Sequence, residues 1–87
     1  MTAMRLIYID ENAREFMKKL GSRDLIKVHS LIYDYLSRKR RPLKEEHDIH
    51  RIEKNYFKLV TVKFQIYFEI DEKDVMWIAD IKANNCN

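Results

Sequence analysis

The C-terminal part of the chain, residues 56–81, constrains the fold more than any other stretch. Apolar and aromatic side chains recur there at every second position, as they do on β-strands that bury one face. Two short segments with apolar residues at helical spacing precede it. Two helices followed by a run of strands, in a chain of 87 residues, predict a small α+β domain.

The N-terminal half predicts a strand and two helices. Residues 4–9 are partly β-branched or aromatic and predict an opening strand. Asp10 is placed to cap the next helix and Gly21 to end it, and Ser22 is placed to cap a second helix. The apolar stripes of the two helices are Ala13, Phe16, Met17 and Leu20, then Leu25, Val28, Ile32, Tyr35 and Leu36. With almost no loop between them, the helices are expected to form an antiparallel hairpin over one sheet face.

The second half predicts strands. Residues 49–53 form a short strand, and Lys54 and Asn55 form a turn. The alternation then changes phase, which indicates a turn or bulge near Val62 and Lys63; a single long bent strand is the alternative. Residues 71–74 form a polar turn before a last strand, in which the alternating residues are Val75, Trp77, Ala79 and Ile81, with Trp77 in the core.

Together these elements predict one domain over residues 1–87. In it an N-terminal strand and a two-helix hairpin pack on a small, mainly antiparallel sheet. Cys86 is the single cysteine, and no His/Cys cluster has zinc spacing, so we expect no disulfide, metal or cofactor. No signal peptide or membrane-spanning run is present, which predicts a cytoplasmic protein. The net charge of +3 is compatible with a nucleic acid or an acidic protein partner.

Two stretches carry a family resemblance. ENAREFMKKLGSRDLIKVHSLIYDYL resembles the helical hairpin of RelE/ParE-superfamily toxins, in which an Ala, an aromatic residue and a Leu face the sheet. KFQIYFEIDEKDVMWIADI is similar to the paired strands of that superfamily, with an acidic turn between them. A small RNA-binding or phage accessory domain with the same order of elements remains a separate hypothesis.

The resemblance implies one of two activities. RelE-like members are ribosome-dependent mRNA endonucleases and ParE-like members inhibit DNA gyrase, and each is neutralised by an antitoxin, here expected to be a small acidic protein. The RelE-like reaction is metal-independent. A 2′-hydroxyl attacks the neighbouring phosphate, which requires a base, cations for the developing charge and a proton donor.

The resemblance transfers to this chain only in part. Lys58 and Lys82 match basic positions of the family's strands. The chain departs from the pattern at Val60, Gln65, Asn84 and Asn85. Either the ribonuclease is weak, or other residues such as His47, His50 and Arg51 have taken over, or the chain is a non-nuclease member acting through protein contacts. The catalytic candidates are therefore Lys58, Lys82, His50 and Arg51.

Three further expectations concern the surface. The basic run at the end of the second helix predicts a nucleic-acid-binding site, although a solvated helix end explains it equally well. Its residues are Arg38, Lys39, Arg40, Arg41 and Lys44. His29 is expected to be a partly buried packing residue. Val60 and Val62 are expected on a sheet face that the helices leave partly uncovered, where a partner would bind.

Overall fold

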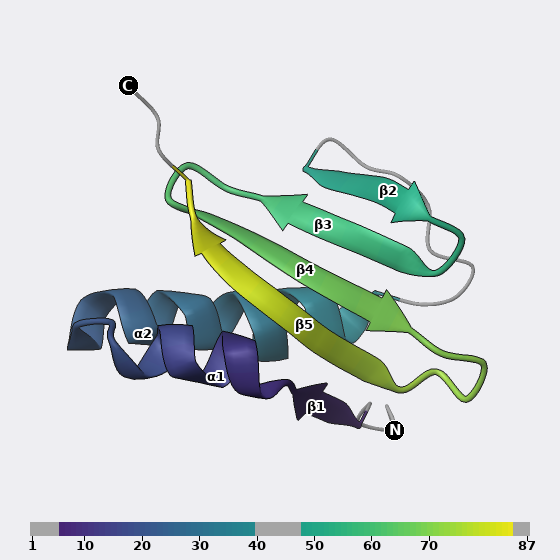
Figure 1. The fold of residues 1–87 in the computed structure, drawn as a ribbon, viewed down its shortest axis with the longest axis horizontal. Coiled ribbons are helices and arrows are strands. Elements are labelled where there is room, and N and C mark those ends of the chain that lie inside the picture. Colours follow the sequence, from purple (N-terminus) through teal and green to yellow (C-terminus); the bar gives the residue numbers. More distant parts are fainter. Residues whose placement is uncertain (1–5, 40–47, 85–87) are drawn as a thin grey trace.

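The computed structural model describes residues 6–39 and 48–84. A five-stranded sheet has the order β1-β5-β4-β3-β2, and α1 and α2 lie side by side on one of its faces (Figure 1). β1 runs parallel to β5, and the other neighbouring strands are antiparallel. The predicted α+β architecture, with a helical hairpin on a mainly antiparallel sheet, is confirmed. No helix in the described part of the chain is long and apolar enough to cross a membrane.

The first strand and helix follow the predicted pattern. β1 spans Ile7–Ile9 and α1 spans Glu11–Lys18, with the Asp10 carboxylate accepting a hydrogen bond from the Asn12 amide as the N-cap. The expectation that Gly21 ends this helix is wrong. Lys19 is the C-cap, and Gly21 has φ −69° and is the N-cap of the next helix, which begins at Ser22. Ser22 is thus inside that helix rather than capping it.

The second helical segment changes its pitch along its length. α2 spans Ser22–Ser30, a π-helical turn spans Leu31–Tyr35, and a 3₁₀ turn spans Leu36–Arg38. The fully buried residues of this segment, Val28, Ile32 and Leu36, are spaced four apart. Each step of four advances a side chain by about 40° around an α-helix of 3.6 residues per turn. The wider π turn offsets this drift, so all three side chains stay on the sheet.

Three strands lie close to their predicted positions. β2 spans Ile49–Glu53, β3 Tyr56–Val60 and β4 Phe64–Ile70. The turn between β3 and β4 contains no glycine or proline. It is closed by Thr61, whose amide donates to the Phe64 carbonyl at 2.8 Å and whose hydroxyl accepts from the Phe64 amide at 3.0 Å. The predicted turn near Val62 is confirmed, and the single long bent strand is wrong.

The last strand has the opposite phase to the one predicted. β5 spans Met76–Ala83 and buries Met76 and Ile78, whereas Trp77 is 44% exposed. Met76 and Ile78 lie opposite Ile70 and Phe68 of β4, so the inward phase of β4 decides which side chains of β5 face the helices. A bulge at Ala79 then shifts the alternation, which places Ile81 in the core as predicted.

The core lies between the helices and one face of the sheet. Aromatic contacts join the two layers, as between Phe16 of α1 and Phe64 of β4, whose ring centroids are 6.2 Å apart. The buried side chains are Ala13, Met17, Val28, Ile32, Leu36, Ile49, Phe57, Leu59, Phe64, Ile66, Phe68, Ile70, Met76, Ile78 and Ile81. No charged or polar residue of the described ranges is buried among them.

Candidate functional site

The face of the sheet opposite the helices carries most of the candidate residues. We call it the open face, because α1 and α2 both pack on the other side (Figure 1). Side chains alternate between the two faces along each strand, so the neighbours of the buried residues belong to the open face. Its residues are Tyr8, His50, Glu53, Tyr56, Lys58, Val60, Gln65, Tyr67, Glu69, Trp77, Asp80 and Lys82.

The pairing of the strands brings three of these residues into one row. His50 of β2 lies opposite Lys58 of β3, and Lys58 lies opposite Tyr67 of β4. Residues directly opposite each other have Cβ atoms about 5 Å apart. Lys82 of β5 lies opposite Gln65, in the neighbouring row. Its side chain nevertheless reaches Tyr67, because its Nζ lies 5.4 Å from the centroid of the Tyr67 ring. Directly opposite Tyr67 on β5 is Asp80. Two lysines therefore flank one phenol, with an imidazole and a carboxylate beside them.

A chain of hydrogen bonds holds the Tyr67 hydroxyl. Tyr67 donates to Gln65 Oε1 at 3.0 Å, and Gln65 Nε2 donates to Asn84 Oδ1 at 3.3 Å. Asn84 Nδ2 in turn donates to the Thr61 carbonyl at 2.7 Å. Gln65 and Asn84, two of the departures from the family pattern, thus tie β4, the end of β5 and the β3–β4 turn together. Asn85 lies outside the described residues.

The valines form a smaller part of the open face than expected. Val60 is half-buried beside Gln65, but Val62 lies in the β3–β4 turn, where it is 79% exposed. The strand positions around them carry polar, charged and aromatic side chains. The expectation of a partly apolar uncovered face at Val60 and Val62 therefore holds for Val60 alone, because the turn removes Val62 from the strand.

Arg51 is not brought together with the other catalytic candidates. It lies opposite Phe57, a core residue, and its Cζ atom is 5.6 Å from the centroid of that ring. His50 and Arg51 are consecutive strand residues and point to opposite sides of the sheet. His50 is consequently the member of this pair that joins Lys58.

Only the beginning of the basic run is described, and it lies at the end of the second helical segment, not on the open face. Arg38 is exposed in the 3₁₀ turn, and the Nζ of Lys39 lies 4.4 Å from the centroid of the Tyr35 ring. Arg40, Arg41, Lys44 and His47 lie outside the described residues. The expectation that His29 is partly buried is wrong: it is exposed on the outer side of α2 and stacks on Tyr33, with ring centroids 5.4 Å apart.

The charge of the open face changes from one end to the other. Burial raises the pKa of the Tyr56 phenol, and electrostatic interactions with Tyr67, Asp80, Glu53 and Glu69 raise it further. The rings of Tyr56 and Tyr67 stack with their centroids 6.2 Å apart, so the two regions meet at this pair. We call His50, Lys58, Tyr67 and Lys82 the basic row, because its cations outnumber Asp80, the carboxylate opposite Tyr67. The part around Tyr56, with Glu53 and Glu69, is acidic.

The basic row offers positive charge and groups that transfer protons. Two lysines stabilise a developing negative charge, while a phenol and an imidazole can each donate or accept a proton. Among residues 6–39 and 48–84, no three His, Cys, Asp or Glu side chains are grouped so that they could hold a metal ion. The arrangement is therefore suited to binding a phosphate group and to acid–base chemistry on it.

Comparison with solved structures identifies the fold. A chain of the RelBE2 toxin–antitoxin complex from Mycobacterium tuberculosis matches with a TM-score of 0.74 and 16% identity, over 97% of this chain and 95% of that one. The chain has the fold of the RelE toxins. The isolated E. coli RelE toxin matches with a TM-score of 0.72 and 16% identity, over 98% of this chain and 88% of that one. The intact E. coli RelBE toxin–antitoxin complex gives 0.61 and 17%, over 97% and 100%.

The similarity to the RelE toxins is one of structure rather than of sequence. No protein-family model and no curated protein sequence matches this chain. At 16–17% identity the match establishes the fold alone. The predicted RelE/ParE resemblance is confirmed at that level, and the activity must be argued from the side chains of this chain.

Tyr67 is the residue of the basic row that the sequence did not single out as catalytic. Aromatic side chains on strands usually pack in the core or on a sheet face. Its alternation with Ile66 and Phe68 does place it on the polar side of β4, together with Gln65. Its position between two lysines depends on the pairing with β3 and β5, which the sequence pattern does not specify.

Proposed function

We propose that this chain is the toxin of a type II toxin–antitoxin pair and that it cleaves mRNA on the ribosome in the manner of RelE. The observation that carries the proposal is the row of His50, Lys58 and Tyr67, with Lys82 beside it, on the face that the helices leave open. The shared fold with the RelE toxins supports it. A cationic sheet face is a surface on which the backbone of a single RNA strand can lie.

The roles in the proposed reaction follow from the chemistry of each side chain. His50 accepts the proton of the 2′-hydroxyl, whose oxygen forms a bond to the adjacent phosphorus. Lys58 and Lys82 stabilise the negative charge of the pentacoordinate phosphate. The bond from phosphorus to the 5′-oxygen breaks, and Tyr67 donates a proton to that oxygen. Arg51 has no direct role, because it lies on the other side of the sheet.

The basic run would add phosphate contacts away from the reacting atoms. Arg38 and Lys39, together with Arg40, Arg41 and Lys44, carry five positive charges within seven residues. Contacts of this kind are independent of base sequence and weaken steeply with salt. Replacing these residues should therefore raise the RNA concentration needed for cleavage and leave the cleavage positions unchanged.

A second candidate function rests on Gln65. Its Oε1 accepts a hydrogen bond from Tyr67 and its Nε2 donates one to Asn84. In the family this position carries a basic residue. A neutral amide with these hydrogen bonds stabilises the fold, but it supplies no positive charge to a phosphate. This observation favours a ParE-like inhibitor of DNA gyrase, or a catalytically silent relative that acts by protein binding.

Inducible expression in a bacterial host separates the two functions. We would compare the chain with the double variant Lys58→Ala, Lys82→Ala and record growth, mRNA 5′ ends and plasmid supercoiling together. Growth arrest with new codon-phased 5′ ends that disappear in the double variant would support the nuclease. Arrest with intact mRNA and altered supercoiling would instead assign the chain to gyrase.

A matched control makes the result specific. Lys27 on α2 and Lys73 in the β4–β5 turn are exposed lysines away from the basic row. The variant Lys27→Ala, Lys73→Ala loses the same charge and should arrest growth as the unchanged chain does. Equal loss of toxicity in both double variants would mean that total charge, and not the row at Lys58 and Lys82, is responsible.

The toxin assignment also predicts an antitoxin. We expect the partner to be a small acidic protein, because the basic row attracts negatively charged groups. Its gene is expected beside the gene of this chain. Co-expression should abolish the growth arrest and raise the thermal midpoint of the purified chain, since binding to the folded state stabilises it. Equal midpoints with and without the partner would count against the pairing.

A further inference from the structure

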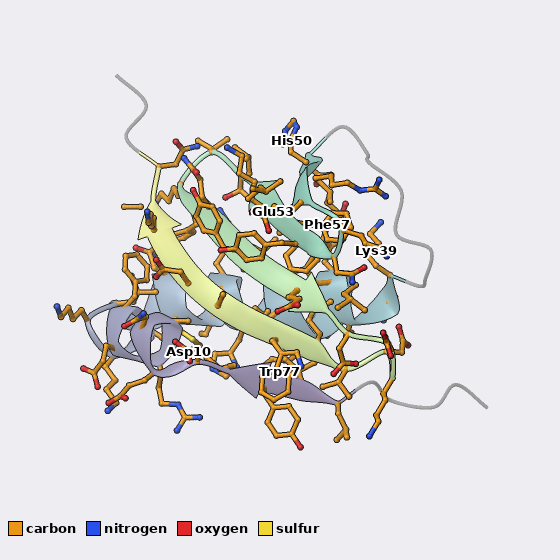
Figure 2. All side chains as sticks on the ribbon, turned by 45° about the vertical axis from the view of Figure 1, so that its right-hand side comes forward. Asp10, Lys39, His50, Glu53, Phe57 and Trp77 are labelled. Atoms are coloured by element: carbon orange, nitrogen blue, oxygen red, sulfur yellow. The ribbon has the colours of Figure 1, made fainter. Side chains whose placement is uncertain are left out.

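The end of the open face furthest from His50 carries an exposed aromatic pair. Tyr8 of β1 and Trp77 of β5 lie opposite each other in register, and their rings stack with centroids 4.7 Å apart and planes inclined by 23°. Tyr8 is 49% exposed and Trp77 is 44% exposed. Figure 2 shows Trp77 and His50 at opposite ends of the molecule. The pair is thus separate from the basic row.

The indole of Trp77 is held in place by the turn that precedes β5. Its Nε1 donates to Asp71 Oδ2 at 3.1 Å, while Asp71 Oδ1 accepts from the amides of Lys73 and Val75. A ring fixed in this way loses little conformational entropy when a ligand covers it. Large aromatic side chains that are rigid and exposed are typical anchors of binding surfaces.

The charges around the pair are mostly negative. Glu69 lies directly opposite Trp77 across β4 and β5. Asp10, Glu11 and Glu15 line the shallow pocket that Tyr8 and Trp77 border, and only Arg14 and Lys18 add positive charge to that lining. Lys18 is paired with Glu15 at 3.2 Å. Among the described residues around the pair, carboxylates therefore outnumber cations even when Lys73 beside Asp71 is included, although the chain as a whole has a net charge of +3.

We infer that the surface formed by Tyr8, Trp77 and Glu69 binds a basic segment of a partner protein. An Arg or Lys side chain of that segment lies over the indole and pairs with the neighbouring carboxylate. Cations are attracted to the face of Trp more strongly than to that of Tyr or Phe. The guanidinium group of Arg both stacks on aromatic rings and binds carboxylates.

The charge of the surface decides between a basic peptide and a nucleic acid. Exposed aromatic rings also stack on bases, so the pair alone would fit single-stranded RNA. The phosphates of RNA, however, would lie beside Glu69, Glu11 and Asp10, and like charges repel. The basic row with Lys58 and Lys82 is the part of the open face suited to phosphate. The inference is independent of the proposed cleavage, because it uses none of the residues assigned to it.

The single tryptophan allows a direct test. Trp77 is the only tryptophan in the chain, so its fluorescence reports on this surface alone. We would titrate the full chain with a hexa-arginine peptide, a hexa-glutamate peptide and a short oligouridine. The arginine peptide should change the emission in a saturable manner that weakens with added salt. The glutamate peptide should not change it.

Two variants and a charge-matched control locate the binding. Tyr8→Ala and Glu69→Gln should each lower the affinity for the arginine peptide by about two- to fivefold, the range expected for an exposed cation–π contact or charge pair. Asp34→Asn removes one negative charge on the helical side, where Asp34 pairs with Ser30, and should leave the affinity unchanged. Glu69→Gln alters an exposed strand residue and keeps the test valid if Tyr8→Ala does not fold.

Three outcomes would overturn the inference. The first is an absence of saturable change with the arginine peptide. The second is an equal loss of affinity in Glu69→Gln and Asp34→Asn, which would show attraction to total charge only. The third is tighter binding of oligouridine than of the arginine peptide, which would make the aromatic pair a platform for RNA bases.

Discussion

The two faces of the sheet use the same strands for different purposes. On β4, Phe64, Ile66 and Phe68 are buried against the helices, while Gln65 and Tyr67 between them point to the open face. The covered face is apolar where the helices pack on it, with Arg51 at its β2 edge, whereas the open face carries lysines, tyrosines and carboxylates. The residues that stabilise the fold and those of the proposed reaction therefore lie on opposite faces of the same sheet. Changes on one face should leave the other largely intact.

Removing an aromatic ring from the covered face should have the largest effect on stability. Phe68 is fully buried on a central strand and stacks on Phe57, with ring centroids 5.7 Å apart. Phe68→Ala should lower the free energy of unfolding by about 3–5 kcal/mol, measured by urea denaturation. The adjacent Glu69→Ala, on the open face, should change it by less than about 0.5 kcal/mol. Similar losses in the two variants would remove the distinction between the faces.

A smaller loss is expected where side chains of the open face hold β4 and the end of β5 to the β3–β4 turn. Asn84→Ala removes the hydrogen bonds from Asn84 Nδ2 to the Thr61 carbonyl and from Gln65 to Asn84 Oδ1. The expected cost is about 1–2 kcal/mol, since these groups are partly buried. Urea denaturation again measures it. Thr61 and Gln65 remain in the variant, so an unchanged midpoint would mean that solvent replaces both bonds.

Acid should reveal the contribution of Asp71 at the aromatic end. The hydrogen bond from Trp77 and those from the amides of Val75 and Lys73 hold the pKa of Asp71 below its ordinary value. The folded chain thus binds this proton more weakly than the unfolded chain. The stabilisation is complete above the ordinary carboxyl pKa of about 3.9 and is lost as the pH falls through the lowered pKa.

The variant Asp71→Asn tests this pH dependence. At neutral pH its urea midpoint, followed by circular dichroism, should lie below that of the unchanged chain, by less than for Asn84→Ala because Asn keeps one acceptor oxygen. The difference should shrink as the pH falls from about 6 to about 2. A difference that stays constant over this range would show that the carboxylate charge contributes nothing.

The smallest effect is expected for the lysines of the basic row. Lys58 and Lys82 lie on the open face and take no part in the apolar core. The double variant Lys58→Ala, Lys82→Ala should change the free energy of unfolding by less than about 0.5 kcal/mol, as is usual for surface substitutions. Thermal denaturation of the purified variant checks this. A large loss would make its growth phenotype uninterpretable as a loss of activity.

Short-range patterns in the sequence predicted the elements well. Alternation located β2 to β4, and the i, i+3, i+4 spacing located both helices and their buried stripes. Asp10 was recognisable as a cap because its carboxylate reaches an amide two residues on. The boundary at Gly21 was missed, since a glycine serves equally well at the end of one helix and at the start of the next.

The candidate site could be predicted only in part. Lys58 and Lys82 were identified from the family resemblance and His50 as a replacement for missing family residues, and β-sheet pairing brings the three together. Arg51 differs from His50 by one position, and one position on a strand reverses the direction of the side chain. Tyr67 became a candidate only when Lys58 and Lys82 were placed on either side of it.

The sequence by itself determined which segments are helices and strands, because those patterns depend on residues within one or two turns of each other. It also determined that one side of β4 is apolar and the other polar. The tertiary structure decided the phase of β5, the exposure of Trp77 and the meeting of Lys58, Tyr67 and Lys82. These features depend on register between strands, and a shift of one residue exchanges the two faces. Register is set by packing between distant segments, which no local pattern contains.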